Sequence, residues 1–197
     1  MPRIVDHERR RRELAEAVWR VVLRDGAHGA SVRGVAREAG WSPGSLRHYF
    51  STQGELLAFA MRLVNERVRA RITALPVEGS PVDVAVRRCE EVLPLDTERR
   101  TEAEVWLALT GAGLADPDLR AIRSEADDGI RELCERLVEY LAAHGAVDAG
   151  RDLAFEAERL RAVVDGVTLH LLLDESPDPA TARRLVRHHL TELARGA

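Results

Sequence analysis

The residues best suited to chemistry lie in one short stretch of the chain, between Ser42 and Phe50. Ser45, Arg47 and His48 occupy the outward positions of a short helix that we expect there. Their hydroxyl, guanidinium and imidazole groups can donate hydrogen bonds to phosphate oxygens and to the edges of bases. This combination indicates recognition of a nucleic acid rather than catalysis.

Two helices around a tight turn must position these side chains. The first helix has an apolar face at helical spacing, made of Val32, Val35, Ala36 and Ala39. Ser31 can cap the beginning of that helix, and Gly40 suits the left-handed position that ends it. Ser42 is the next cap, and Pro43 is a favourable first helical residue. The inward stripe of the second helix is Leu46, Tyr49 and Phe50. This order is typical of a helix-turn-helix, whose second helix enters a DNA major groove.

The stretch from Gly40 to Leu56 resembles the TetR family of bacterial transcriptional regulators. It has small residues before a Leu-Arg-His-Tyr-Phe run, and Glu55-Leu56 then opens a long helix. The resemblance covers roughly the first quarter to third of the chain, and the rest resembles the family's helical ligand and dimer domain only diffusely. Two positions depart from the family pattern, which often has an aromatic residue at Arg47 and usually a phosphate-binding lysine at Gln53. The form seen in this chain is similar to the branch of choline-responsive BetI-type repressors.

The resemblance and the polar outward positions together imply a set of DNA-binding residues. They are Ser31, Arg33, Ser42, Gly44, Ser45, Arg47, His48, Tyr49 and Gln53. The implied function is that of a repressor that leaves its double-stranded DNA operator when a small-molecule effector binds. The identity of that effector is left open. Two alternatives also stay open: a TetR-like activator, and a helical enzyme or structural bundle whose helix-turn-helix resemblance is accidental.

The distribution of charge agrees with a nucleic-acid partner for the first part of the chain only. The net charge of the whole chain is −4, and every basic residue other than histidine is an arginine. Residues 1–71 hold 14 arginines and 8 acidic residues, a net charge of +6, whereas the remaining residues have a net charge of −10. A basic N-terminal part on an acidic body predicts an anionic partner for the former. Chance clustering, with four arginines at 9–12, is the alternative.

Several classes of protein are disfavoured by missing motifs. The sequence has no phosphate loop, no nucleophile elbow, and no cysteine-pair or His-Glu-x-x-His metal signature. We therefore expect no enzyme activity, no catalytic residue, no cofactor and no metal ion. The beginning of the chain is polar and rich in arginine, and no apolar run is long enough to span a bilayer. We expect a cytoplasmic protein with no membrane partner.

Helical periodicity continues through the whole chain, without the alternation that is typical of strands. The predicted fold is all-α, with about nine helices. A three-helix helix-turn-helix domain is expected over residues 1–53, and a helical domain for effector binding and dimerisation over residues 54–197. A long fourth helix, ending near Leu75, follows the DNA-binding residues, so the two domains should be joined through this helix rather than by a linker.

The helix expected at 151–174 changes character along its length, because residues 163–173 are apolar nearly all round. Such a helix must be covered on both sides, and the last helix also has an apolar stripe. These two helices therefore predict a homodimer, as the TetR resemblance also implies. The candidate interface residues are Leu169, Leu172, Leu173, Val186, His189 and Leu190, with Leu172 and Leu190 on the exposed side. A fully interior helix in a monomer is the alternative.

Trp106 is the most informative residue of the body for ligand binding, because it is the only tryptophan beyond residue 50. An indole offers a large flat contact area and can hold a cation. The candidate ligand-binding residues are Phe59, Leu63, Trp106, Leu109, Val164 and His170. The alternatives are an ordinary packed aromatic at Trp106 and a core or interface histidine at His170.

Overall fold

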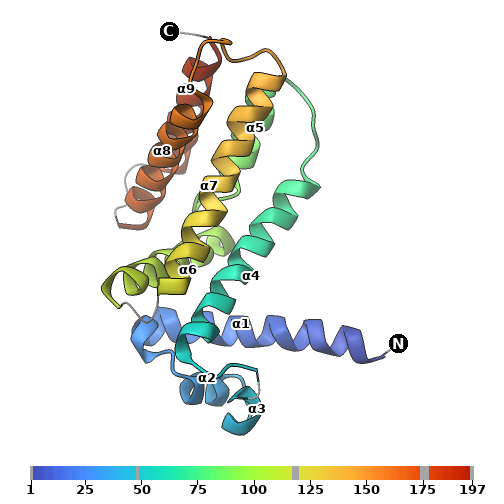
Figure 1. Ribbon diagram of the computed structural model, residues 1–197, viewed down its shortest axis with the longest axis vertical. Coiled ribbons are helices and arrows are strands. Elements are labelled where there is room, and N and C mark those ends of the chain that lie inside the picture. Colours follow the sequence, from blue (N-terminus) through green and yellow to red (C-terminus); the bar gives the residue numbers. More distant parts are fainter. Residues whose placement is uncertain (1, 48, 117–119, 174–177, 196–197) are drawn as a thin grey trace. The chain divides into compact units, whose positions relative to one another are not determined.

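The computed structural model describes residues 2–47, 49–116, 120–173 and 178–195. Within these residues the protein has nine helices and no strand (Figure 1). In chain order the helices are α1 (Pro2–Gly29), α2 (Val32–Glu38), α3 (Pro43–Arg47), α4 (Gln53–Ala74), α5 (Pro81–Glu90), α6 (Thr97–Ala115), α7 (Arg120–Ala143), α8 (Leu153–Leu173) and α9 (Pro179–Arg195). The predicted all-α architecture with about nine helices is therefore confirmed.

Signals in the sequence explain where the first helices begin and end. Ser31 caps α2, and its hydroxyl oxygen accepts a hydrogen bond from the Gly34 backbone N–H at 3.1 Å. Gly40 has a φ of +70°, a left-handed conformation that glycine adopts at little cost. Helix α1 continues to Gly29, and a φ of 73° at Gly26 produces a kink near its C-terminal end.

The chain divides into two compact units. We call residues 1–67 together with 104–126 the N-terminal unit, and residues 68–103 together with 127–197 the C-terminal unit. The first boundary between the two units falls inside α4, between Arg67 and Val68. Helices α6 and α7 are also divided between the two units. The functional domain boundary expected after residue 53 stays a prediction.

The core of the N-terminal unit is built on α1 and the first half of α4. The apolar stripe of α1 is buried: Leu14, Ala15, Ala17, Val18, Trp19, Val21 and Val22. The Trp19 indole N–H donates to the Ala60 carbonyl at 3.3 Å, and the Arg67 guanidinium lies 4.6 Å above the Trp19 ring. The rings of Phe50 and Phe59 pack with their centroids 5.0 Å apart. These contacts tie α4 to the helix-turn-helix.

The C-terminal unit has its own apolar core, formed by α5, α7, α8 and α9. Its largest fully buried side chains are Leu93, Leu137, Leu141, Leu160 and Leu190. Helix α9 packs against both α5 and α8 (Figure 1). Cys89 and Cys134 are buried free cysteines within this core. Burial raises the pKa of the Cys134 thiol to about 12, so the thiol is un-ionised and unreactive at neutral pH.

Candidate nucleic-acid interface

The turn between α2 and α3 is closed by backbone hydrogen bonds. The Trp41 N–H donates to the Ala36 carbonyl at 2.8 Å, which is the bond expected when a left-handed glycine ends a helix. Ser42 then caps α3, because its hydroxyl oxygen accepts from the Ser45 N–H at 3.1 Å. The hydroxyl groups of Ser42 and Ser45 also lie 2.8 Å apart. The turn therefore holds the beginning of α3 in a defined orientation.

One face of α3 is anchored in the protein and the other is exposed. Leu46 is fully buried, and the Tyr49 and Phe50 N–H groups both donate to its carbonyl at 3.0 Å. Most of the predicted DNA-binding residues are exposed, namely Ser31, Arg33, Ser42, Gly44, Ser45, Arg47 and Tyr49. His48 lies outside the residues that the structure describes. The anchored Leu46 thus turns the polar positions of α3 outward, which is the arrangement that a recognition helix requires.

A groove of about 730 Å³ runs beside α3 in the N-terminal unit. Arg10 and Glu13 of α1 line one part of it, and the turn and α3 contribute Gly40, Trp41, Ser42, Gly44, Ser45 and Tyr49. The rings of Trp41 and Tyr49 meet edge to face, with centroids 5.9 Å apart. This contact limits the positions open to the Tyr49 ring, which is 50% exposed. Trp41 lines this groove although it was not among the predicted DNA-binding residues.

Gln53 has a role inside the protein that the sequence did not predict. Its side-chain Nε2 donates to the Ala27 carbonyl at 2.9 Å and to the His28 carbonyl at 3.2 Å. These carbonyls end α1, so Gln53 caps one helix from the first turn of another. Both hydrogens of the amide nitrogen are used in these bonds, and the side chain has no further N–H for a phosphate. A phosphate contact through Nε2 is therefore inconsistent with this geometry.

A pair of arginines fixes α2 to α1. Arg20 Nε lies 2.8 Å from one Glu38 oxygen, and Arg24 Nη1 lies 2.9 Å from the other. Hydrogen bonds from Arg20 and then Arg24 lower the pKa of the Glu38 carboxyl group. The carboxylate thus stays charged across the physiological pH range. These two arginines hold α2 against α1, whereas Arg33 is exposed at the beginning of α2 and Arg47 is exposed on α3.

The candidate ligand-binding residues fall in both units of the structure. Phe59, Leu63 and Leu109 are buried in the N-terminal unit, and Trp106 is half-buried in the same unit. Val164 belongs to the apolar core of the C-terminal unit, at 2% exposed. His170 lies six residues further along α8, which turns it by about 240° from Val164.

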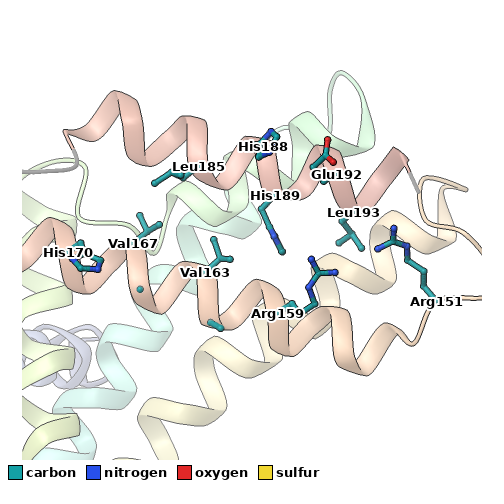
Figure 2. Close-up of a pocket in the computed structure, with 12 residues that line it drawn as sticks. Arg151, Arg159, Val163, Val167, His170, Leu185, His188, His189, Glu192 and Leu193 are labelled. Carbon is teal, nitrogen blue, oxygen red and sulfur yellow. The ribbon is translucent and has the colours of Figure 1, made fainter. Parts of the chain in front are cut away.

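His170 is exposed and lines a groove between α8 and α9 instead (Figure 2). The expectation that Val164 and His170 form one site was therefore wrong, because they lie on different faces of α8.

The groove between α8 and α9 has a volume of about 770 Å³ and lies wholly in the C-terminal unit. Of the predicted dimer residues, Leu173 is 65% exposed, Leu169 is 37% exposed and Leu172 is half-buried. Val186 and Leu190 are completely buried in the protomer's own core. Leu190 was expected on the exposed side, and this was wrong: α9 turns it inward. His189 is partly buried and lines the groove.

Comparison with known proteins identifies the family. Residues 14–60 match the family described as bacterial regulatory proteins of the tetR family. Residues 81–195 match the family described as BetI-type transcriptional repressor, C-terminal. These two ranges contain the helix-turn-helix and most of the C-terminal helices.

Similar proteins span nearly the whole chain. The HTH-type transcriptional regulator PksA of Bacillus subtilis (strain 168) is 45% identical over 88% of this chain and 84% of its own. The HTH-type transcriptional regulator BetI of Escherichia coli O157:H7 is 30% identical over 98% of this chain and 97% of its own. A crystal structure of a transcriptional regulator from Rhodococcus sp. Rha1 has a TM-score of 0.77 at 30% identity, covering 95% of this chain and 97% of that one.

Two further findings complete this description. These relatives are transcriptional regulators and not enzymes, in agreement with the missing catalytic motifs. In the described part of the chain, no helix combines the length and the apolar character needed to cross a membrane.

Three findings identify the family of this chain: the exposed polar face of α3, the match to both family descriptions, and the relatives that span most of the chain. The chain belongs to the TetR family of bacterial transcriptional regulators, with a C-terminal part of the BetI type.

Proposed function

We propose that this regulator is a cytoplasmic repressor that binds its operator as a homodimer and leaves it when a small molecule binds. The observation that carries the proposal is the orientation of α3: Leu46 is fully buried, while Ser45 and Arg47 are exposed. Arginine can bind guanine through two hydrogen bonds, and serine can donate to a phosphate or a base. In a dimer, two α3 helices would enter successive major grooves roughly 34 Å apart.

The proposed dimer surface is the outer face of α8 and α9. It exposes three leucines, Leu169, Leu173 and Leu185, that contribute little to the protomer's own core. Apolar side chains on one helix pair favour association, since each buried leucine gains roughly 1.5–3 kcal/mol. A two-fold axis would bring the same surface of each copy together.

The proposed effector site includes the face of α6 that carries Trp106 and Thr110. These residues are four apart, and residues at this spacing share a helix face. Among the described residues, the buried Thr110 hydroxyl has no hydrogen-bond partner. A buried hydroxyl without a partner is costly, and a polar group of a ligand could satisfy it. Trp106 would supply apolar contact area beside it.

Effector and operator binding are coupled through thermodynamic linkage. If the effector weakens operator binding by some factor, the operator must weaken effector binding by the same factor. A ligand that binds both forms of the dimer equally cannot cause release. The proposal therefore predicts that operator DNA lowers the affinity for the effector.

A gel-shift experiment on DNA that flanks the protein's own gene tests the proposed function. We expect a retarded complex with two protomers per site, and a footprint that covers two half-sites about one helical turn apart. Unrelated DNA of the same length and base composition is the control. Equal retardation of both DNAs at moderate salt would refute sequence-specific regulation by this chain.

A further inference from the structure

Three histidines line the groove between α8 and α9, and neither the DNA interface nor the proposed effector site accounts for them. They are His170 of α8 and His188 and His189 of α9. Figure 2 shows the His189 side chain pointing from α9 toward α8, into the space beside Arg159. Among the described residues, its Nε2 atom is buried and has no hydrogen-bond partner. Burial, followed by the charge of Arg159, lowers the pKa of His189.

The other charged groups around His189 balance one another while the histidines are neutral. Glu156 is only 5% exposed, and its carboxylate oxygens lie 3.0 Å from Arg151 Nη1 and 2.8 Å from Arg159 Nη1. Glu192 of α9 also lines the groove. Two arginines and two glutamates therefore give a net charge of zero. Protonation of the three histidines would add three positive charges to each copy.

Three other arginines of these helices form ion pairs outside the groove. Arg187 of α9 pairs with Asp83 at 2.7 Å, and Arg183 pairs with Glu90 at 3.7 Å, both toward α5. On α8, Arg161 pairs with Glu158 at 2.8 Å. None of these residues lines the groove. They provide no negative charge that would compensate protonated histidines within it.

Gly166 indicates what covers the groove. It lies on α8 among the lining residues, near Ala162, and its φ is not positive. A Cβ atom at this position would meet no described atom within 4 Å. The protomer itself therefore has no need for glycine here, although glycine in a helix costs roughly 0.5–1 kcal/mol relative to alanine. A second helix packed closely against α8 would explain it, because small residues let helix backbones approach.

We propose that protonation of the histidines that line the α8–α9 groove separates the two copies of the proposed dimer. The inference rests on the homodimer of the proposed function and adds a pH dependence to it. Two apposed grooves would bring six additional positive charges together at low pH. Burying such unpaired charges is unfavourable, so the dimer forms while the histidines are neutral.

The direction of the pH dependence follows from linkage. Histidine has an ordinary pKa near 6.5, and burial in the interface lowers the pKa of a histidine in the dimer below that in the separate protomer. The separate protomers then bind more protons than the dimer does. Dimer stability is therefore full above the ordinary histidine pKa of about 6.5 and is lost as the pH falls below it. Operator binding should weaken over the same range.

Sedimentation velocity of the full chain tests the proposal at constant salt, at about pH 8 and about pH 5.5. We expect the dimer dissociation constant to rise at least about tenfold at the lower pH. Each histidine that must lose its proton before the dimer forms multiplies this rise. The triple variant His170→Asn, His188→Asn, His189→Gln should lose this pH dependence. His144→Asn is the matched control, because His144 is an exposed histidine at the end of α7, outside the groove. It should keep the full pH dependence.

A second variant tests the groove without any titration. Gly166→Ala should stabilise the protomer by restricting the unfolded chain, yet weaken dimerisation at about pH 8. Unchanged or tighter dimerisation would contradict the placement of a second copy on this face.

Three outcomes of the sedimentation experiment overturn the pH dependence. They are a dissociation constant independent of pH, the same pH dependence in the triple variant, and loss of the dimer on adding a chelator at about pH 8, which would assign the histidines to a metal ion. The gel shift at about pH 8 does not depend on any of these three outcomes. If specific operator binding is found at about pH 8 while one of the three outcomes also occurs, only the pH dependence is wrong; if specific operator binding is absent at about pH 8, the proposed function itself is wrong.

Discussion

Arg71 of α4 and Glu102 of α6 form a two-pronged ion pair inside the C-terminal unit. Arg71 Nη1 lies 3.0 Å from Glu102 Oε1, and Nη2 lies 2.6 Å from Oε2. Arg71 Nε also lies 2.9 Å from Glu91 Oε2, and the Glu102 hydrogen bonds are the largest influence that raises the pKa of Arg71. The Glu102 side chain is only 4% exposed. The pair therefore fixes the last turns of α4 to α6.

Loss of this ion pair should destabilise the protein. Glu102→Gln removes the main partner of Arg71 but leaves Glu91 beside it, so the loss of these charged hydrogen bonds should cost about 1.5–3 kcal/mol. Arg136→Gln is the matched control, because Arg136 pairs with Glu132 in the same unit but is 64% exposed, and the change should cost no more than about 1 kcal/mol. Urea unfolding measures both. Similar unfolding free energies for the two variants would argue against a structural role for the Arg71–Glu102 pair.

Gln53 should stabilise α1 rather than contact DNA directly. Gln53→Met removes the two hydrogen bonds to Ala27 and His28, and should lower the free energy of unfolding by about 1–3 kcal/mol. Operator affinity at constant salt should stay as in the wild type. A clear loss of operator affinity in folded Gln53→Met would show that Gln53 does contact a phosphate, since a neutral amide leaves the salt dependence unchanged.

The reverse substitution restores the residue usual in the family. Gln53→Lys should strengthen operator binding and steepen the plot of log affinity against log salt by about 0.9 for each protomer. Fluorescence anisotropy over a range of salt concentrations gives this slope. An unchanged slope would mean that the lysine cannot reach the DNA backbone from this position.

The exposed and buried leucines of α8 and α9 should respond differently to a charge. Leu173→Glu, at a 65% exposed position, should give folded monomers that bind the operator weakly. Leu190→Glu, at a fully buried position, should unfold the C-terminal unit, because a carboxylate in an apolar core has no partner. Light scattering and circular dichroism separate the two results. A folded dimer in Leu173→Glu would place the interface elsewhere.

Trp106 provides a spectroscopic test of the effector site. Screening small molecules for release of the operator identifies a ligand, and that ligand should change the tryptophan emission. Trp106→Phe should remove most of this change and weaken ligand binding, while leaving operator affinity nearly intact. A large fall in thermal stability with an unchanged ligand response would instead assign Trp106 to core packing.

Much of the fold could be predicted from the sequence because it depends on local signals. Three of these signals act over only a few residues: the helical periodicity, the cap at Ser31 and the glycine at Gly40. The structure confirms the helices that they predict. These features do not depend on distant parts of the chain. Of the predicted inward stripe, Leu46 is fully buried and Phe50 is partly buried, but Tyr49 was wrongly included, because α3 ends at Arg47 and the Tyr49 side chain is 50% exposed.

The features that could not be predicted depend on contacts between distant residues. The all-round apolar end of α8 gives no sign of which leucines face outward, and α9 turns Leu190 inward through its packing on α5 and α8. The bond from Gln53 to Ala27 joins residues 26 positions apart, and the pair of Arg71 and Glu102 spans 31 positions. Periodicity carries no information about such partners.

The most direct test of recognition by α3 is the affinity of Arg47→Ala for the operator and for a scrambled DNA of equal length. Arg47 is exposed on α3, and loss of a base contact should weaken operator binding by about 1–3 kcal/mol. Binding to the scrambled DNA should change much less, so the ratio of the two affinities should fall roughly 5- to 150-fold. Fluorescence anisotropy gives both affinities at one salt concentration. An equal loss on both DNAs, or no loss on either, would contradict base recognition through Arg47 on this helix.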